Sequence, residues 1–160
     1  MERKMRRFKQ QIPAEESMYI LRRNTSGVLA LCGNDMMPYA VPLSHAVDGD
    51  RLIFHSAKDG HKLDLIRENG HASFCVVDLD EVHPERFTTY FRSVIVFGRI
   101  RIIEDESGRL EAAKIIGRRC NTDEKALEDE LAKGFSRVVM LEMTIDRIKG
   151  KQAIELTKNE

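Results

Sequence analysis

The sequence predicts a mainly β (α+β) domain, a six-stranded antiparallel, Greek-key-like barrel with peripheral helices. Short apolar runs recur along the chain between turns rich in Gly, Asn and Asp, and short hairpin turns join antiparallel strands. Helical stretches are few and do not alternate with the strands, which argues against a doubly wound parallel sheet. The length of 160 residues and the hydrophobic content of 42% fit one globular domain with its own core.

Composition narrows the function classes. The formal net charge of zero argues against a nucleic-acid partner, and no apolar run is long enough to span a membrane. Three widely spaced cysteines without metal-ligand or redox-pair spacing are typical of a cytoplasmic protein with reduced thiols. We expect a single domain over residues 1–160, with a basic tail at 1–10 and a charged C-terminal tail at 152–160.

The first third of the chain reads as a helix followed by two strands. Pro13 and the acidic residues after it are typical of a helix start, and residues 24–27 end that helix. The apolar residues 28–32 predict a buried strand, and residues 39–47 predict a second one. Because proline has no N–H to donate to a sheet, Pro42 places this second strand at an edge or a bulge.

Residues 52–62 combine the end of a strand, a Gly-containing turn and the first turn of a helix. Helix N-termini attract anions through their unpaired N–H groups and the helix dipole. His55, Ser56, His61 and Lys62 would add further donors at the same place. The stretch is therefore a candidate phosphate site, although a solvated strand-to-helix connection explains the same residues.

The rest of the chain supplies two more strands before the end helices, and one after them. Residues 72–77 predict a strand, residues 78–89 a polar surface loop, and residues 94–103 the longest strand. Gly98 inside the long strand indicates a bulge or tight bend. Residues 138–145 form the last expected strand. Two helices precede it, beginning at residues 104–107 and 122–123, and the second ends at Gly134.

Other chemistries find less support. Ser44, Ser56 and Ser93 could act as nucleophiles, but no G-x-S-x-G turn is present. The spacing of the histidines matches no metal-ligand pattern, so we expect no metal. Neither the dinucleotide-binding G-x-G-x-x-G pattern nor the standard phosphate-loop pattern occurs. An Arg-Ser pair at Arg92 and Ser93 could bind a phosphate or a carbonyl group, or simply face solvent.

Several short motifs, taken in order, resemble a known family. They are Pro38-Tyr39-Ala40-Val41-Pro42-Leu43-Ser44, Phe54-His55-Ser56-Ala57, Gly60-His61-Lys62-Leu63, and Phe91-Arg92-Ser93-Val94 leading into Val96-Phe97-Gly98. Together they resemble the FMN-binding split-barrel flavoproteins related to pyridoxamine 5′-phosphate oxidase, and among these the nitroimidazole-resistance (Nim-type) group. The resemblance extends from about residue 6 to residue 151.

The resemblance implies a split β-barrel that forms a homodimer, with FMN at the subunit interface and a small-molecule substrate. It implies that Val41, Pro42, Leu43 and Ser44 line the isoalloxazine ring with backbone groups. The phosphate end would be held by His55, Ser56, Ala57, His61 and Lys62, and the site would be completed by Arg92 and Ser93. If any side chain there has a catalytic role, the candidate is His55.

The implied activity is an FMN-dependent reductase of electron-poor compounds such as nitroimidazoles. Two departures from the family pattern bear on it. His61 stands where another basic residue is common, so phosphate affinity would fall as this imidazole loses its proton. The segment Arg147-Ile148-Lys149-Gly150-Lys151-Gln152 lacks the Arg-Leu-x-Pro pattern of the true oxidases, which argues against pyridoxamine phosphate oxidation. The alternatives are an oxidase-like activity, or a flavin- or haem-binding protein without turnover.

Overall fold

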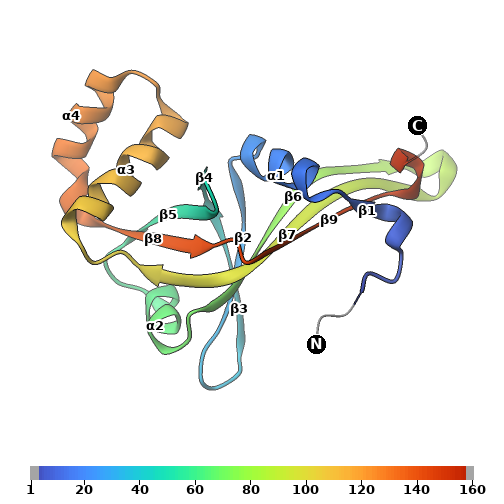
Figure 1. Cartoon of the computed structure of the whole chain (residues 1–160), viewed down its shortest axis with the longest axis horizontal. Helices are drawn as coiled ribbons and strands as arrows, with labels where there is room; N and C mark the ends of the chain where they lie inside the picture. Colours follow the sequence, from blue (N-terminus) through green and yellow to red (C-terminus); the bar gives the residue numbers. More distant parts are fainter. Residues whose placement is uncertain (1–3, 158–160) are drawn as a thin grey trace.

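The computed structural model describes residues 4–157 and contains nine strands in one sheet of largely antiparallel neighbours (Figure 1). Their order is β3-β2-β6-β7-β8-β5-β4, with β9 on β7 and β1 on β9. The two ends of this path, β3 and β4, do not pair, so the barrel is open, as the prediction of a split barrel requires. The strands are Gln11–Ile12 (β1), Ser26–Cys32 (β2), Pro38–Ser44 (β3), Ala46–Asp48 (β4), Arg51–Ala57 (β5), His71–His83 (β6), Thr88–Ile102 (β7), Val138–Thr144 (β8) and Arg147–Gln152 (β9).

The α-helices lie outside the barrel, and all four agree with the sequence prediction. Asp105 and Asp123 are the N-caps of the last two, where their carboxylates accept hydrogen bonds from backbone N–H groups of the first turn. Both caps fall at the helix starts predicted from the sequence. The helices are Ala14–Arg23 (α1), His61–Glu68 (α2), Glu106–Cys120 (α3) and Glu124–Gly134 (α4).

Strand β7 joins the two halves of the sheet. Its first half pairs with β6 and β9, and its last residues pair with β8. Figure 1 shows that β7 curves strongly along its length, and Gly98 lies between Phe97, the last residue paired with β9, and Ile100, the first paired with β8. A Cβ atom on Gly98 would lie 1.8 Å from the carbonyl oxygen of Thr144, so only glycine permits this close approach. The bend predicted at Gly98 is confirmed.

The loop predicted at residues 78–89 is wrong. Strand β6 continues to His83 and β7 begins at Thr88, with a 3₁₀ turn (Pro84–Arg86) between them. The two strands thus form a long hairpin arm, whose register shifts once between Val77 and Leu79. The β-branched and aromatic residues of this stretch favour a strand, and this preference is stronger than the preference of its charged residues for a loop.

The chain ends also differ from expectation. No strand was predicted after residue 145, but residues 147–152 form β9, and a 3₁₀ helix covers Ile154–Thr157 within the expected charged tail at 152–160. Within the expected basic tail, Phe8–Gln10 form a 3₁₀ turn in which Gln10 is buried. Residues 1–3 and 158–160 lie outside the described residues. The expected strand 39–47 is divided into β3 and β4, because the chain turns at His45.

Two apolar clusters position the site. The larger one fills the barrel between β2, β5, β6, β7, β8 and α2, with Phe54 and Phe74 in edge-to-face contact at its centre. The smaller one lies on the other side of β5, where Ile53 and Met140 meet Ala112 and Ile116 of α3. Strand β5 therefore packs against an apolar cluster on each face, and each of its polar residues lies next to one of these two clusters.

Candidate flavin site

The turn from β5 into α2 has the geometry of an anion site. Gly60 is the N-cap of α2 with a φ of 136°, a value that side-chain-bearing residues rarely adopt, and an added Cβ would meet no atom within 4 Å. No described side chain caps this helix. The backbone N–H groups of His61 and Lys62 in the first turn therefore have no capping side chain, and an anionic oxygen could accept from them.

His61 brings this turn beside strand β3. Its ring lies edge-on to the ring of Tyr39, with 5.0 Å between the centroids. Two of the predicted groups of site residues, the helix start and β3, thus lie at the same end of the barrel. Tyr39 was predicted only as a strand residue, and its contact with His61 was not visible in the sequence.

His55 and Ser56 were predicted at one phosphate site, but β5 turns them to opposite faces. Ser56 is 4% exposed and lies on the barrel side with Phe54. Its hydroxyl is buried and has no hydrogen-bond partner among the described residues. His55 is exposed and lies on the side of α3 and α4, away from Ser56. Ala57, the last residue of β5, is exposed and returns to the face of His55.

Strand β3 offers an open edge. Within the described residues it pairs with β2 alone, so Pro42 lies on an edge strand, as predicted. The side chains of Val41 and Leu43 pack against the core. Pro42 and Ser44 alternate with them and are exposed on the outer face. Backbone groups along the free edge of β3 are thus available to a ligand.

Arg92 and Ser93 are not brought to the α2 turn within one chain. They pair with the C-terminal end of β9 and with β6 in the hairpin arm. Strand β7 meets the residues that follow α2 near its C-terminal end, where the N–H of Ile100 donates to Gly70 and Arg99 pairs with His71. Ile100 lies seven residues after Ser93, roughly 23 Å along the strand at about 3.3 Å per residue.

Arg92 already has an anionic neighbour in the arm. Its guanidinium lies 3.6 Å from the carboxylate of Asp78, which also accepts hydrogen bonds from Arg23 and Asn24. Burial alone would raise the pKa of Asp78, but these hydrogen bonds and the two positive charges outweigh it and lower the pKa below its ordinary value. The Nε of Arg92 is buried without a partner among the described residues.

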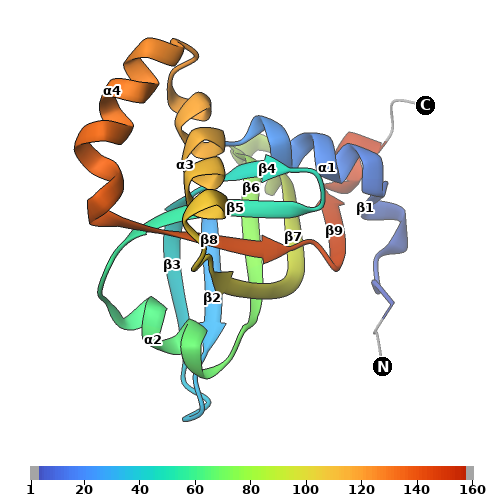
Figure 2. The same ribbon diagram turned by 60° about the vertical axis from the view of Figure 1, so that its left-hand side comes forward.

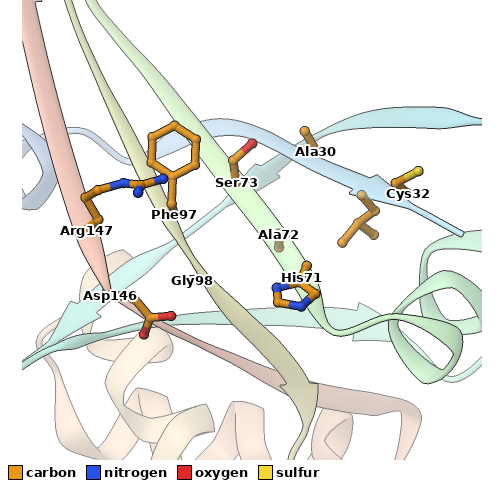
Figure 3. A pocket seen from close by; sticks show the side chains of 10 residues that line it. Ala30, Cys32, His71, Ala72, Ser73, Phe97, Gly98, Asp146 and Arg147 are labelled. Carbon is orange, nitrogen blue, oxygen red and sulfur yellow. The ribbon is translucent and has the colours of Figure 1, made fainter. Parts of the chain in front are cut away.

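The outer face of the sheet carries a hollow beside β3. Its volume is about 710 Å³, and it lies across β2, β6, β7 and the turn into β9. Figure 3 shows Ser73, Phe97 and Arg147 around it, with the Arg147 guanidinium 4.4 Å from the centre of the Phe97 ring. Arg147 lay outside the predicted strands, although its alternation with Lys149 and Lys151 already had the period of a strand.

The same face exposes apolar side chains. Val77, Val28 and Ile95 are 61%, 39% and 37% exposed, on three neighbouring strands. Burial raises the pKa of the Cys75 thiol, which lies between Val28 and Ile95, so this cysteine is a protonated, unreactive neighbour. An exposed apolar face of this kind is typical of an interaction surface.

Two features are absent from the part of the chain that the structure describes. There, no three His, Cys, Asp or Glu side chains come together in a group that could hold a metal ion. Over the same residues, no helix has the length and apolar character needed to cross a membrane.

Comparison with known proteins assigns the family. Residues 13–152 match the family model described as pyridoxamine 5′-phosphate oxidase. The chain belongs to this family. The match covers the whole sheet except β1 and includes every residue of the candidate site. A search of curated proteins finds no match.

Solved structures share the fold. A FAD-binding protein from Mesorhizobium loti is 26% identical, with a TM-score of 0.61 over 89% of this chain and 96% of that one. The flavocytochrome Anf3 from Azotobacter vinelandii is 20% identical, with a TM-score of 0.79 over 94% and 72%. A candidate 5-nitroimidazole antibiotic resistance protein from Bacteroides thetaiotaomicron is 19% identical, with a TM-score of 0.72 over 89% and 86%.

Proposed function

We propose that the protein is a cytoplasmic FMN-binding flavoprotein that reduces small electron-poor molecules such as nitro compounds. The observation that carries flavin binding is the uncapped α2 turn beside an open β3 edge. Family membership and the similarity to flavin-binding structures support it. The similarity to the Bacteroides protein motivates the choice of nitro compounds as substrates.

The residues at the α2 turn fit the phosphate of FMN. The first-turn N–H groups, the ammonium of Lys62 and the imidazole of His61 all favour an anion. The flat ring system would lie along β3, where Pro42 and Ser44 leave the backbone accessible.

The proposal includes a homodimer, because the predicted site is divided within one chain. Arg92 and Ser93 lie in the hairpin arm, far along β7 from the α2 turn, so the partner's copies would complete the site. The exposed Val77, Val28 and Ile95 would be covered in the same contact. Sedimentation velocity tests this point: we expect a dimer for the native chain, and a monomer at all concentrations would contradict it.

Bound FMN would supply the electron transfer, while the chain binds and orients both cofactor and substrate. A catalytic role for His55 stays a prediction. Its position on the opposite face of β5 from Ser56 gives it no direct path to the phosphate end, and the proposal assigns no step to it.

The first experiment is the visible spectrum of the purified protein, followed by titration of the apoprotein with FMN. We expect Lys62→Ala to weaken FMN binding about 10- to 100-fold, since one charge-assisted hydrogen bond contributes about 1.5–3 kcal/mol. Lys58→Ala removes the same charge from the preceding turn and is the matched control, with an expected change below about threefold. A protein that does not bind FMN, or equal affinities in the two variants, would refute the site.

Turnover is a separate question from binding. Flavin-loaded protein is mixed with a nitroimidazole and a reduced nicotinamide donor, and loss of the nitro absorbance is followed. We expect reduction that depends on the protein. Tight FMN binding without any reduction would favour the alternative of a flavin-binding protein without turnover.

A further inference from the structure

A basic patch lies beside β1 at the rim of the sheet. It consists of four exposed cations, Lys4, Arg6, Arg7 and Lys9. The last of them belongs to the 3₁₀ turn Phe8–Gln10, which leads directly into β1 and so lies next to β9. In Figure 2 this turn is on the opposite side of the molecule from α4. Gln10 is buried and its N–H donates to the carbonyl oxygen of Arg7, so the turn holds the patch against the domain.

The patch concentrates positive charge in a chain whose formal net charge is zero. Residues 3–14 contain five Lys or Arg side chains and no Asp or Glu. Among residues 4–157, none of the four cations of the patch forms an ion pair with a carboxylate. Their charge is therefore not neutralised locally, and an anionic partner would be attracted to this part of the surface.

Two exposed apolar side chains lie among these cations. Phe8 is 71% exposed, and Ile154, from the last 3₁₀ helix, is 40% exposed. Both line a hollow of about 360 Å³, whose walls also include Arg6, Arg7 and Lys9. The described lining of this hollow contains no Asp or Glu. Positive charge and uncovered apolar surface are thus combined at one place, although they come from segments far apart in the sequence.

This combination favours a membrane surface over a nucleic acid. A peripheral membrane contact needs cations that attract anionic headgroups, together with apolar side chains that enter the boundary between headgroups and acyl chains. The patch supplies the first, and Phe8 and Ile154 supply the second. A nucleic-acid-binding domain is typically basic as a whole, whereas the positive charge of this chain is balanced by its carboxylates outside the patch.

We propose that the basic patch, with Phe8 and Ile154, is a docking surface for an anionic lipid bilayer. The four cations bind the phosphate and carboxylate groups of the lipid headgroups, and the two apolar side chains enter the bilayer just below them. Since much of the attraction is between charges at a surface, the contact is reversible and salt weakens it. The inference does not depend on flavin binding.

The test measures co-sedimentation of the full-length protein with two kinds of vesicle, phosphatidylcholine alone and phosphatidylcholine mixed with phosphatidylserine. We expect binding to the anionic vesicles that decreases as salt is added. Arg6→Ala combined with Arg7→Ala should weaken it about 25-fold, because each cation near an anionic surface contributes about fivefold. Lys125→Ala combined with Lys133→Ala removes two exposed cations from α4 and should change it less than about twofold. Equal losses in the two double variants, or no binding to anionic vesicles, would overturn the proposal.

Two further arms test the apolar contribution and the class of partner. Phe8→Ala should weaken vesicle binding about fivefold, because part of the ring leaves water in the bound state. Met37→Ala removes a side chain of similar exposure, 67%, from the β2–β3 turn and should have almost no effect. Equal affinities in these two variants would contradict the entry of Phe8 into the bilayer. If single-stranded RNA binds through Arg6 and Arg7 while the vesicles do not bind, the partner is a nucleic acid and the proposal is wrong.

Discussion

The carboxylate of Asp78 connects α1 to the hairpin arm. Replacing Asp78 by Asn tests how much this contact contributes to the free energy of unfolding. The Asp78 side chain is 4% exposed. It accepts hydrogen bonds from Arg23 Nε at 2.7 Å and from Asn24 Nδ2 at 2.8 Å, and a further one from the second guanidinium nitrogen of Arg23. Asn preserves the shape but removes the charge that Arg23 and Arg92 share.

The expected loss at pH 7 is about 2 kcal/mol in the free energy of unfolding. A hydrogen bond to a charged group contributes about 1.5–3 kcal/mol. The Arg23 side chain is 40% exposed, and solvent screening moves the value toward the lower end of that range. The matched control is Asp64→Asn, which breaks an exposed pair with Arg67 and is expected to cost below about 0.5 kcal/mol.

The same substitution carries a pH signature. The pKa of Asp78 is lowered in the folded state, so its stabilisation is fully present above the unfolded pKa of about 3.9 and is lost as pH falls through the folded value. The difference in the free energy of unfolding between the native chain and Asp78→Asn should thus decrease from pH 7 to pH 3. Urea denaturation followed by circular dichroism measures it. A gap below about 0.5 kcal/mol at pH 7, or one that widens in acid, would refute the reasoning.

Two other perturbations follow from close packing and from burial. Gly98→Ala forces a Cβ against the Thr144 carbonyl and should lower the free energy of unfolding by at least about 3 kcal/mol. Gly134→Ala is the control: no atom lies nearer than 3.6 Å to its added Cβ, and it should change the free energy of unfolding by less than about 1 kcal/mol. Urea denaturation measures both variants, and similar losses of stability would contradict the bend at Gly98. Burial lowers the pKa of His45, so below pH 6.5 the unfolded chain binds a proton that the folded chain does not, and stability should fall with decreasing pH by up to about 1.4 kcal/mol per unit. His45→Gln should reduce that slope between pH 6.5 and 5 and the exposed His71→Gln should not; identical slopes in both variants would contradict it.

The sequence predicted what depends on local signals and missed what depends on pairing. Caps, proline and glycine positions marked all four α-helices, the edge position of β3 and the bend at Gly98. The arm and β9 were missed because their residues are charged and become strands only when β7 lies between them. The alternation of side chains along a strand could have predicted that His55 and Ser56 lie on opposite faces of β5. The sequence could not show which of these faces packs against α3 and α4.

The pairing of β1 with β9 bears on how the protein folds during synthesis. Gln11 lies opposite Lys151 and Ile12 opposite Gly150, so β1 waits for a strand that is made after all the other described strands. Until residues 147–152 leave the ribosome, Ile12 and Ile20 lack the surface that covers them, and the N-terminal segment has no strand to join. The domain therefore completes its fold only after residues 147–152 have been made, and a nascent chain stalled before residue 147 would present the apolar face of α1 for chaperones to bind.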